Sequence, residues 1–128
     1  LFDVDITIIK KVAKNLQKVM ENAVNSEIFV IESFFNILKT GGGTTPHAHI
    51  SFDDKLFNTG AQKYSLVYYL RVGDQDAREP GTLKLFDPYL EILPEQGMIV
   101  VIPAGRKHAA VYDGISNQII IGVNFYSL

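Results

Sequence analysis

The apolar residues near the start of the chain recur at helical spacing. Between residues 5 and 24 they return every three or four positions, and lysines and a glutamate fill most positions between them. This pattern is typical of a helix with one apolar face. Asp3 or Asp5 is placed to cap its start, and Asn25-Ser26 ends the pattern. We predict one amphipathic helix over residues 5–24. Its apolar face consists of Ile9, Val12, Ala13, Leu16, Val19, Met20 and Ala23.

From residue 28 onward the pattern changes to runs of β-branched and aromatic residues. Clusters of Gly, Pro, Asp or Asn separate these runs, as expected for strands joined by turns. Several short strands at fairly even spacing predict a mainly β fold, either a sandwich or a barrel. The predicted strands cover residues 28–38, 62–72, 81–87, 97–103 and 118–126.

Length and composition narrow the class of protein. With 128 residues, 47% of them hydrophobic, the chain is predicted to form a single domain over 1–128, with the helix at about 5–24 and a β-barrel at about 28–127. A net charge of −2 and the lack of a basic stripe argue against nucleic-acid binding. The absence of cysteine excludes disulfides, zinc thiolate sites and cysteine nucleophiles.

The start of the chain lacks the order of charges and apolar residues that a signal peptide needs, and no apolar run approaches the roughly 18 residues of a membrane span. We therefore expect a cytoplasmic protein with no membrane partner. The first residue is Leu rather than Met, which leaves open that an upstream portion is missing.

Histidines are the strongest candidates for chemistry. His47 and His49 are two residues apart in TPHAHISFDD, so in an extended strand both imidazoles point to the same side. The alternative is a polar loop after GGGTTP. The third and last histidine, His108, follows the strand-like GMIVVIPAGRK. Imidazoles that converge from different strands are typical of a metal site with N and O ligands.

The positions of the three histidines resemble the two sequence signatures of the cupins. The first signature is matched by the spacing of Gly41, His47, His49, Asp53 and Gly60, with Asp in place of the usual Glu. The second is matched by Gly97, Pro103, Gly105 and His108, although Tyr112 stands where Asn is usual. The resemblance implies a metal ion held by His47, His49 and His108, with Asp53 as an optional fourth ligand.

About three quarters of the sequence, from IESFFNILKTGGGTTPHAH to QIIIGVNFYSL, resembles the 2-oxoglutarate and Fe(II)-dependent oxygenases. These enzymes share the double-stranded β-helix, a jelly roll, with the cupins. The shared segments, in order, are the histidine segment, the strands YSLVYYL and GTLKLFDP, the strand before the distal histidine, and the last strand. The resemblance implies a double-stranded β-helix with the helix packed on its outside.

The same resemblance implies site residues and cofactors. His47 and His108 would be Fe(II) ligands, and His49 would occupy the position of the carboxylate in the HxD version of the motif. Tyr69 would lie near 2-oxoglutarate, in a pocket between the metal and its strand. Iron is favoured by resemblance alone, because imidazoles also suit Zn, Ni and Cu. The implied reaction is the hydroxylation of an unknown small-molecule or peptide substrate.

One residue departs from the oxygenase pattern. Gln118 stands where these enzymes usually have an arginine that holds the far carboxylate of 2-oxoglutarate. A neutral amide cannot balance that charge. Lys84 or Arg71 are candidate replacements, since strand alternation would put Arg71 on the face of Tyr69; the alternative for both is a solvated surface charge. Arg106 and Lys107 are interpreted as loop charges.

The acidic residues leave two ligand sets open. If His49 is not a ligand, Asp53 or Asp54 would complete a site of two histidines and one carboxylate. If His49 is a ligand, the site has three histidines. We interpret Asp54 as an ordinary surface acid.

Two functions are consistent with these observations. One is an Fe(II)- and 2-oxoglutarate-dependent dioxygenase, and the other is a cupin-like metal- and ligand-binding protein without oxoglutarate chemistry. A cation that points into the barrel near Tyr69 would favour the first, and a cation-free barrel the second. The loops at 50–61 and 73–80 are expected to choose the substrate. Either a monomer or a homodimer is compatible with the sequence.

Overall fold

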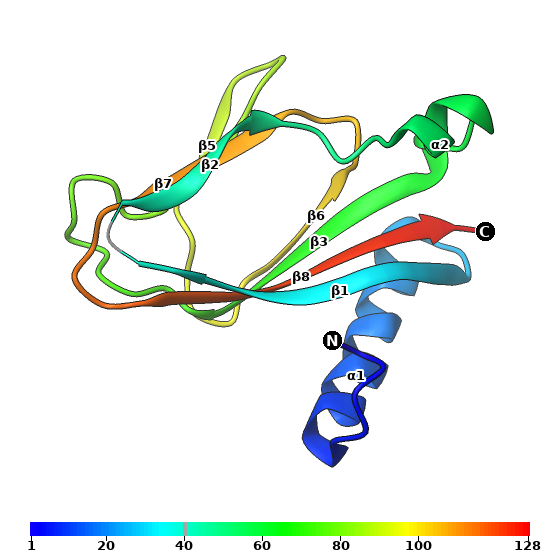
Figure 1. Ribbon diagram of the computed structural model, residues 1–128, viewed down its shortest axis with the longest axis horizontal. Coiled ribbons are helices and arrows are strands. Elements are labelled where there is room, and N and C mark those ends of the chain that lie inside the picture. The colour runs from blue at the N-terminus through cyan, green and yellow to red at the C-terminus, as the bar shows by residue number, and fades with distance from the viewer. Residues whose placement is uncertain (40) are drawn as a thin grey trace.

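The computed structural model describes residues 1–39 and 41–128, and its strands form two four-stranded antiparallel sheets (Figure 1). The strand orders are β1-β8-β3-β6 and β2-β7-β4-β5. Except for the β4–β5 pair, successive strands alternate between the sheets, which is the jelly-roll arrangement. The predicted double-stranded β-helix is therefore confirmed. The elements are α1 (Thr7–Val24), β1 (Ile28–Leu38), β2 (Gly42–His47), α2 (Phe52–Leu56), η1 (Gly60–Gln62), β3 (Lys63–Arg71), β4 (Leu83–Leu85), β5 (Leu90–Ile92), β6 (Ile99–Pro103), β7 (His108–Tyr112) and β8 (Gln118–Ser127).

The N-terminal helix begins two residues later than predicted. Ile6 is its N-cap and provides no side-chain hydrogen bond, so the prediction that Asp3 or Asp5 caps the helix is wrong. Asp5 instead forms an exposed ion pair with Lys10, at 2.5 Å. The helix ends as predicted, because Asn25 adopts the left-handed conformation, with a φ of 52°. None of the helices formed by the described residues has both the length and the apolar character that a membrane crossing requires.

Helix α1 covers the outer face of the β1-β8-β3-β6 sheet (Figure 1). Leu16 and Met20 on its apolar face are buried and pack against side chains of β3 and β8. This confirms that the helix lies outside the barrel. The central strands β3 and β8 are consequently covered by the helix on one face and by the barrel interior on the other. The buried cluster on the helix side contains Leu16, Met20, Leu66, Ile121, Val123 and Phe125.

Three strands had not been predicted as strands. Strand β2 contains two glycines and a proline, which are unfavourable in isolated strands. Strand β5 has only three residues, and β7 directly follows the PAGRK turn. All three belong to the β2-β7-β4-β5 sheet, which we call the smaller sheet because most of its strands are shorter than those of the β1-β8-β3-β6 sheet, the larger sheet. There, pairing with neighbouring strands compensates for weak local preference.

Strand β2 comes so close to β7 that a side chain at Gly43 would not fit. Gly43 has a φ of +145°, and a Cβ there would lie 2.3 Å from the carbonyl oxygen of Ala110. Gly41 also has a positive φ, +81°, but a Cβ at Gly41 would meet nothing within 4 Å.

We therefore expect Gly43→Ala to lower the free energy of unfolding by about 1–3 kcal/mol more than Gly41→Ala. Urea denaturation of both variants measures the difference, and equal losses would contradict the close approach.

Candidate metal centre

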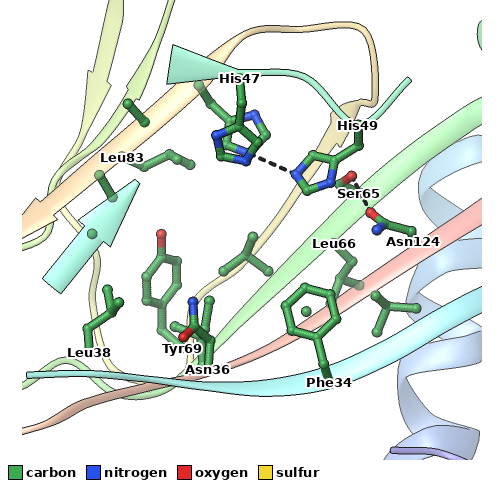
Figure 2. A pocket seen from close by; sticks show the side chains of 18 of the residues that line it. Phe34, Asn36, Leu38, His47, His49, Ser65, Leu66, Tyr69, Leu83 and Asn124 are labelled. Atoms are coloured by element: carbon green, nitrogen blue, oxygen red, sulfur yellow. Dashed lines mark hydrogen bonds between the residues drawn. The ribbon is translucent and has the colours of Figure 1, made fainter. Parts of the chain in front are cut away.

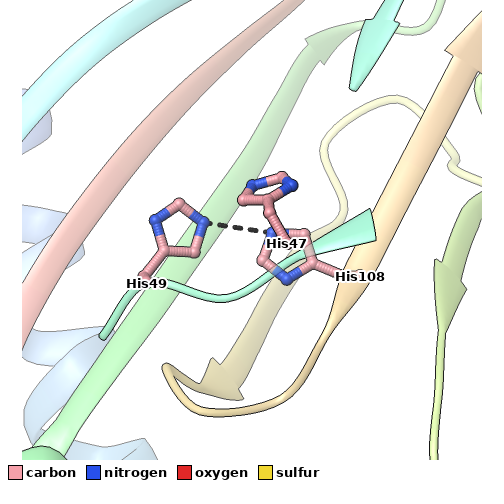
Figure 3. Close-up of side chains that lie close together, drawn as sticks. All are labelled: His47, His49 and His108. Carbon is pink, nitrogen blue, oxygen red and sulfur yellow. Dashed lines mark hydrogen bonds between the residues drawn. The ribbon is translucent and has the colours of Figure 1, made fainter. Parts of the chain in front are cut away.

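Two of the three histidines face each other across neighbouring strands. His47 ends β2 and His108 begins β7, and the two residues are paired in register. His49 lies two residues beyond His47, where its backbone N–H donates to the carbonyl of Ala104 at 2.8 Å. This bond holds the segment after β2 against the barrel. The three side chains consequently point toward one another (Figure 3).

The spacing of the three rings suits a single metal ion. Nε2 of His49 lies 3.1 Å from Nε2 of His108, and the three potential ligand atoms lie within 4.8 Å of one another. Nitrogens that share one ion at about 2.0–2.1 Å are about 3.0–3.4 Å apart. The predicted convergence of His47, His49 and His108 is therefore confirmed, and the cluster fits Fe(II) or a related ion.

The protonation states of the rings also suit a metal. Nδ1 of His108 is 3.1 Å from the carbonyl oxygen of Arg106; when Nδ1–H donates to this oxygen, Nε2 keeps its lone pair for the centre. Burial, followed by the neighbouring histidines, lowers the pKa of His49 to about 4. Burial also lowers the pKa of His108. Both rings are thus neutral near pH 7, as metal coordination requires.

A cavity of about 250 Å³ extends from the histidines into the barrel (Figure 2). Tyr69, Asn36 and Gln118 line it from the larger sheet, and Leu38 and Leu83 contribute apolar surface. The expected pocket between the metal site and the strand of Tyr69 is therefore present. Tyr69 is only 3% exposed, and burial raises its pKa to about 12. Its phenol is accordingly a neutral hydrogen-bond donor.

Neither candidate cation reaches this cavity. Lys84 lies between Leu83 and Leu85, which are both buried, so alternation directs its side chain away from the interior. Arg71 is exposed because the register shifts between Tyr69 and Arg71, which breaks the alternation. The expectation that Arg71 shares the face of Tyr69 is therefore wrong. Among the described residues that line the cavity there is no Lys or Arg.

Gln118 lies at the predicted position near the start of the last strand. Its side chain is 1% exposed and lines the cavity. Nε2 donates to the carbonyl of Val72 at 3.2 Å. The amide also packs closely against Gly81, where an added Cβ would lie 2.6 Å from Nε2. The residue is thus held in place as a neutral part of the wall.

The two candidate carboxylates differ from expectation. Asp53 is exposed and does not join the histidine cluster, which contains no acid among the described residues. Asp54 is 1% exposed, so its interpretation as a surface acid is wrong. Its carboxylate accepts hydrogen bonds from Lys63 at 2.7 Å, and from Ser51, Thr59 and Tyr126. The sequence signal was the Ser51-x-x-Asp54 capping box that starts α2.

A chain of polar side chains, not expected from the sequence, lies beside the histidines. The hydroxyl of Ser65 donates to Oδ1 of Asn124 at 2.6 Å, and Nδ2 of Asn124 donates to Glu32 at 2.6 Å. Ser65 and Asn124 line the cavity near His49 (Figure 2), and the negative charge of Glu32 partly opposes the lowering of the His49 pKa. The signal was a single polar residue, Asn124, within the otherwise apolar stretch 119–125 of β8.

Neither a protein-family model nor a curated protein matches the sequence. Solved structures do match. The viral collagen prolyl hydroxylase of Paramecium Bursaria Chlorella virus-1, solved as a 2OG (2-oxoglutarate) complex, has a TM-score of 0.74 at 13% identity, covering 100% of this chain and 76% of that chain. A 2OG-Fe(II) oxygenase family oxidoreductase from Burkholderia pseudomallei has a TM-score of 0.71 at 13% identity, covering 96% and 58%. The fold is that of the 2OG-Fe(II) oxygenases.

Another solved structure of this fold matches the chain less closely than the two oxygenases do. A predicted oxalate decarboxylase from Thermotoga maritima has a TM-score of 0.51 at 15% identity, covering 88% of this chain and 74% of that chain. The chain spans less than two thirds of the Burkholderia oxidoreductase. At these identities the similarity shows the fold alone.

Proposed function

We propose that this protein is a non-haem Fe(II)-dependent dioxygenase that hydroxylates a small-molecule or peptide substrate with a 2-oxo acid as co-substrate. The observation that carries the proposal is the convergence of His47, His49 and His108 at the mouth of a cavity in an oxygenase fold. Bound Fe(II) would supply the redox-active centre for O₂ chemistry. Three neutral ligands leave the full charge of the ion to attract an anionic chelating group.

The remaining cavity residues would bind and orient the co-substrate. Tyr69 and Asn36 offer hydrogen bonds at the inner end, and the apolar side chains Leu38 and Leu83 exclude water. Ser65 and Asn124 line the cavity on the side of His49 (Figure 2). 2-Oxoglutarate is the co-substrate that the fold implies. The cavity residues do not fit its far carboxylate, however, because no described cation lines the cavity.

We expect Fe(II) to bind with one ion per chain and to stabilise the fold. At a free concentration of about 100 times the dissociation constant, it should raise the free energy of unfolding by about 2.7 kcal/mol. Anaerobic calorimetric titration gives the stoichiometry, and denaturation with and without the ion gives the stabilisation. Mg²⁺, which prefers oxygen ligands, is the control and should produce neither effect. No stabilisation at saturating Fe(II) would contradict a metal centre.

Oxygen consumption tests the reaction class. Iron-loaded protein is mixed with 2-oxoglutarate or an uncharged-tail 2-oxo acid, and O₂ uptake is measured beside the visible absorption of the anaerobic iron chelate. We expect a chelate band, and O₂ uptake that requires both iron and a 2-oxo acid. If iron is bound and neither signal appears with any 2-oxo acid, the dioxygenase proposal fails and the cupin-like alternative stands.

A further inference from the structure

We infer that the inner end of the cavity binds an uncharged group that accepts hydrogen bonds, so that the ligand is a 2-oxo acid with a neutral tail rather than 2-oxoglutarate. The inference rests on the proposed function, because the other end of the ligand is taken to chelate the metal at His47, His49 and His108. It concerns the three residues at the opposite end, Asn36, Tyr69 and Gln118, which we call the floor.

The charges around the floor argue against a second carboxylate. The described residues that line the cavity include no Lys, Arg, Asp or Glu. Lys84 and Arg71, the two cations that the sequence suggested for binding the far carboxylate, do not line the cavity. A carboxylate transferred from water to this end would lose hydration without gaining a cation, which is costly in a largely apolar cavity. The positive charge of the site is instead concentrated at the metal, where the chelating end binds.

Two polar groups of the floor are available to a neutral ligand. The hydroxyl of Tyr69 points into the cavity and the amide of Asn36 lies beside it (Figure 2). Within the described part of the chain, neither side chain has a hydrogen-bond partner. No fully buried side-chain N or O atom among these residues lacks a partner, so both groups are accessible from the cavity. Each can donate to a carbonyl oxygen of a ligand.

The third floor residue, Gln118, already uses one N–H of its amide. Gln118 donates from Nε2 to the carbonyl of Val72. Its amide also packs against Gly81, where any side chain would clash with it. This holds the amide in the cavity wall, where it adds no charge to the floor. Tyr69 and Asn36, whose side chains have no partner among the described residues, are therefore the main groups that would bind the ligand tail.

Three 2-oxo acids of equal chain length test the inference. 2-Oxoglutarate ends in a carboxylate, its 5-methyl ester ends in an uncharged carbonyl acceptor, and 2-oxovalerate has no oxygen at that end. All three share the same chelating 2-oxo carboxylate. Their dissociation constants are measured on anaerobic Fe(II)-loaded protein from the visible chelate band and by calorimetry. We expect the ester to bind at least about tenfold more tightly than 2-oxoglutarate, and about fivefold more tightly than 2-oxovalerate.

Removing the hydroxyl of Tyr69 tests whether this group is responsible for the preference for the ester. Tyr69→Phe should reduce the advantage of the ester over 2-oxovalerate, because only Asn36 then donates to the ester carbonyl, while leaving iron binding unchanged. Tyr68→Phe is the matched control, because Tyr68 directly precedes Tyr69 on β3 and packs on the helix side. This variant should leave the affinities for all three 2-oxo acids unchanged. A Tyr68→Phe effect as large as that of Tyr69→Phe would overturn the role of the Tyr69 hydroxyl.

The outcomes separate the two proposals. If iron does not bind, the proposed function fails and the inference fails with it. If iron binds and 2-oxoglutarate is the tightest of the three ligands, the inference is overturned while the proposed function stands. Iron binding without measurable affinity for any 2-oxo acid would also overturn the inference.

Discussion

Replacing His108 with alanine is expected to weaken Fe(II) binding by more than about 100-fold, because losing even a hydrogen-bond partner of a metal ligand costs about 10–100-fold. His108 lies opposite His47 and is 3.1 Å from His49 through their Nε2 atoms. Its removal leaves two histidines, too few to hold the ion firmly. Anaerobic titration of wild type and variant, with circular dichroism to verify folding, measures the change.

Two further variants separate ligation from structural damage. Asp53→Asn should leave Fe(II) affinity unchanged, since Asp53 is exposed and outside the cluster. His49→Asp should still bind Fe(II), because two histidines and one carboxylate also form an iron site. An unchanged affinity in the His108 variant, or a comparable loss in Asp53→Asn, would contradict the three-histidine centre.

Asp54→Ala is expected to lower the free energy of unfolding by about 3–5 kcal/mol, because it leaves the buried ammonium of Lys63 without its counter-ion. Lys63 is 7% exposed and lies 2.7 Å from Asp54. Asp53→Ala, at the neighbouring exposed acid of the same helix, is the matched control and should change stability by no more than about 0.5 kcal/mol. Chemical denaturation measures both, and similar values for the two variants would contradict the buried pair.

The Asp54 carboxylate should also make the stability of the protein depend on pH. Burial alone would raise the pKa of Asp54, but hydrogen bonds from Lys63, Tyr126 and Ser51 outweigh it and hold the pKa well below the ordinary 3.8. A depressed pKa in the folded state stabilises the protein above the unfolded value and loses that effect as pH falls. The stability difference between wild type and Asp54→Asn should therefore be constant above about pH 5 and shrink below pH 3.8. A difference that does not shrink would show that the carboxylate charge contributes nothing.

The long elements and the histidine triad could be predicted from the sequence. Strands β1, β3 and β8 are apolar runs of 9–11 residues, and helix α1 shows a clear apolar face. His47 and His49 share an i, i+2 spacing, which placed both rings on one side, and the motif spacing linked them to His108. These signals are local, or depend on residue order alone.

What could not be predicted depended on tertiary pairing. Strands β2 and β5 have weak local preferences and exist because neighbouring strands bind them. The direction of Arg71 depends on a register shift against β8, which alternation along β3 cannot reveal. Asp54 is buried because Lys63 of β3 and Tyr126 of β8 pack against its carboxylate. Neither residue belongs to α2, so the sequence of the helix does not reveal these contacts.

The division of the site between two sheets has a consequence for how such proteins diversify. His47 and His108 belong to the smaller sheet and His49 follows it, whereas Asn36, Tyr69 and Gln118 all belong to the larger sheet. Under the proposed function, a substitution on the larger sheet would change which organic molecule the cavity accepts while leaving the three histidines in place. On the same proposal, single exchanges of a neutral for a charged residue would change the preferred co-substrate, while the residues proposed to hold iron stay the same. The same separation makes the larger sheet the place to randomise when a new co-substrate is to be engineered.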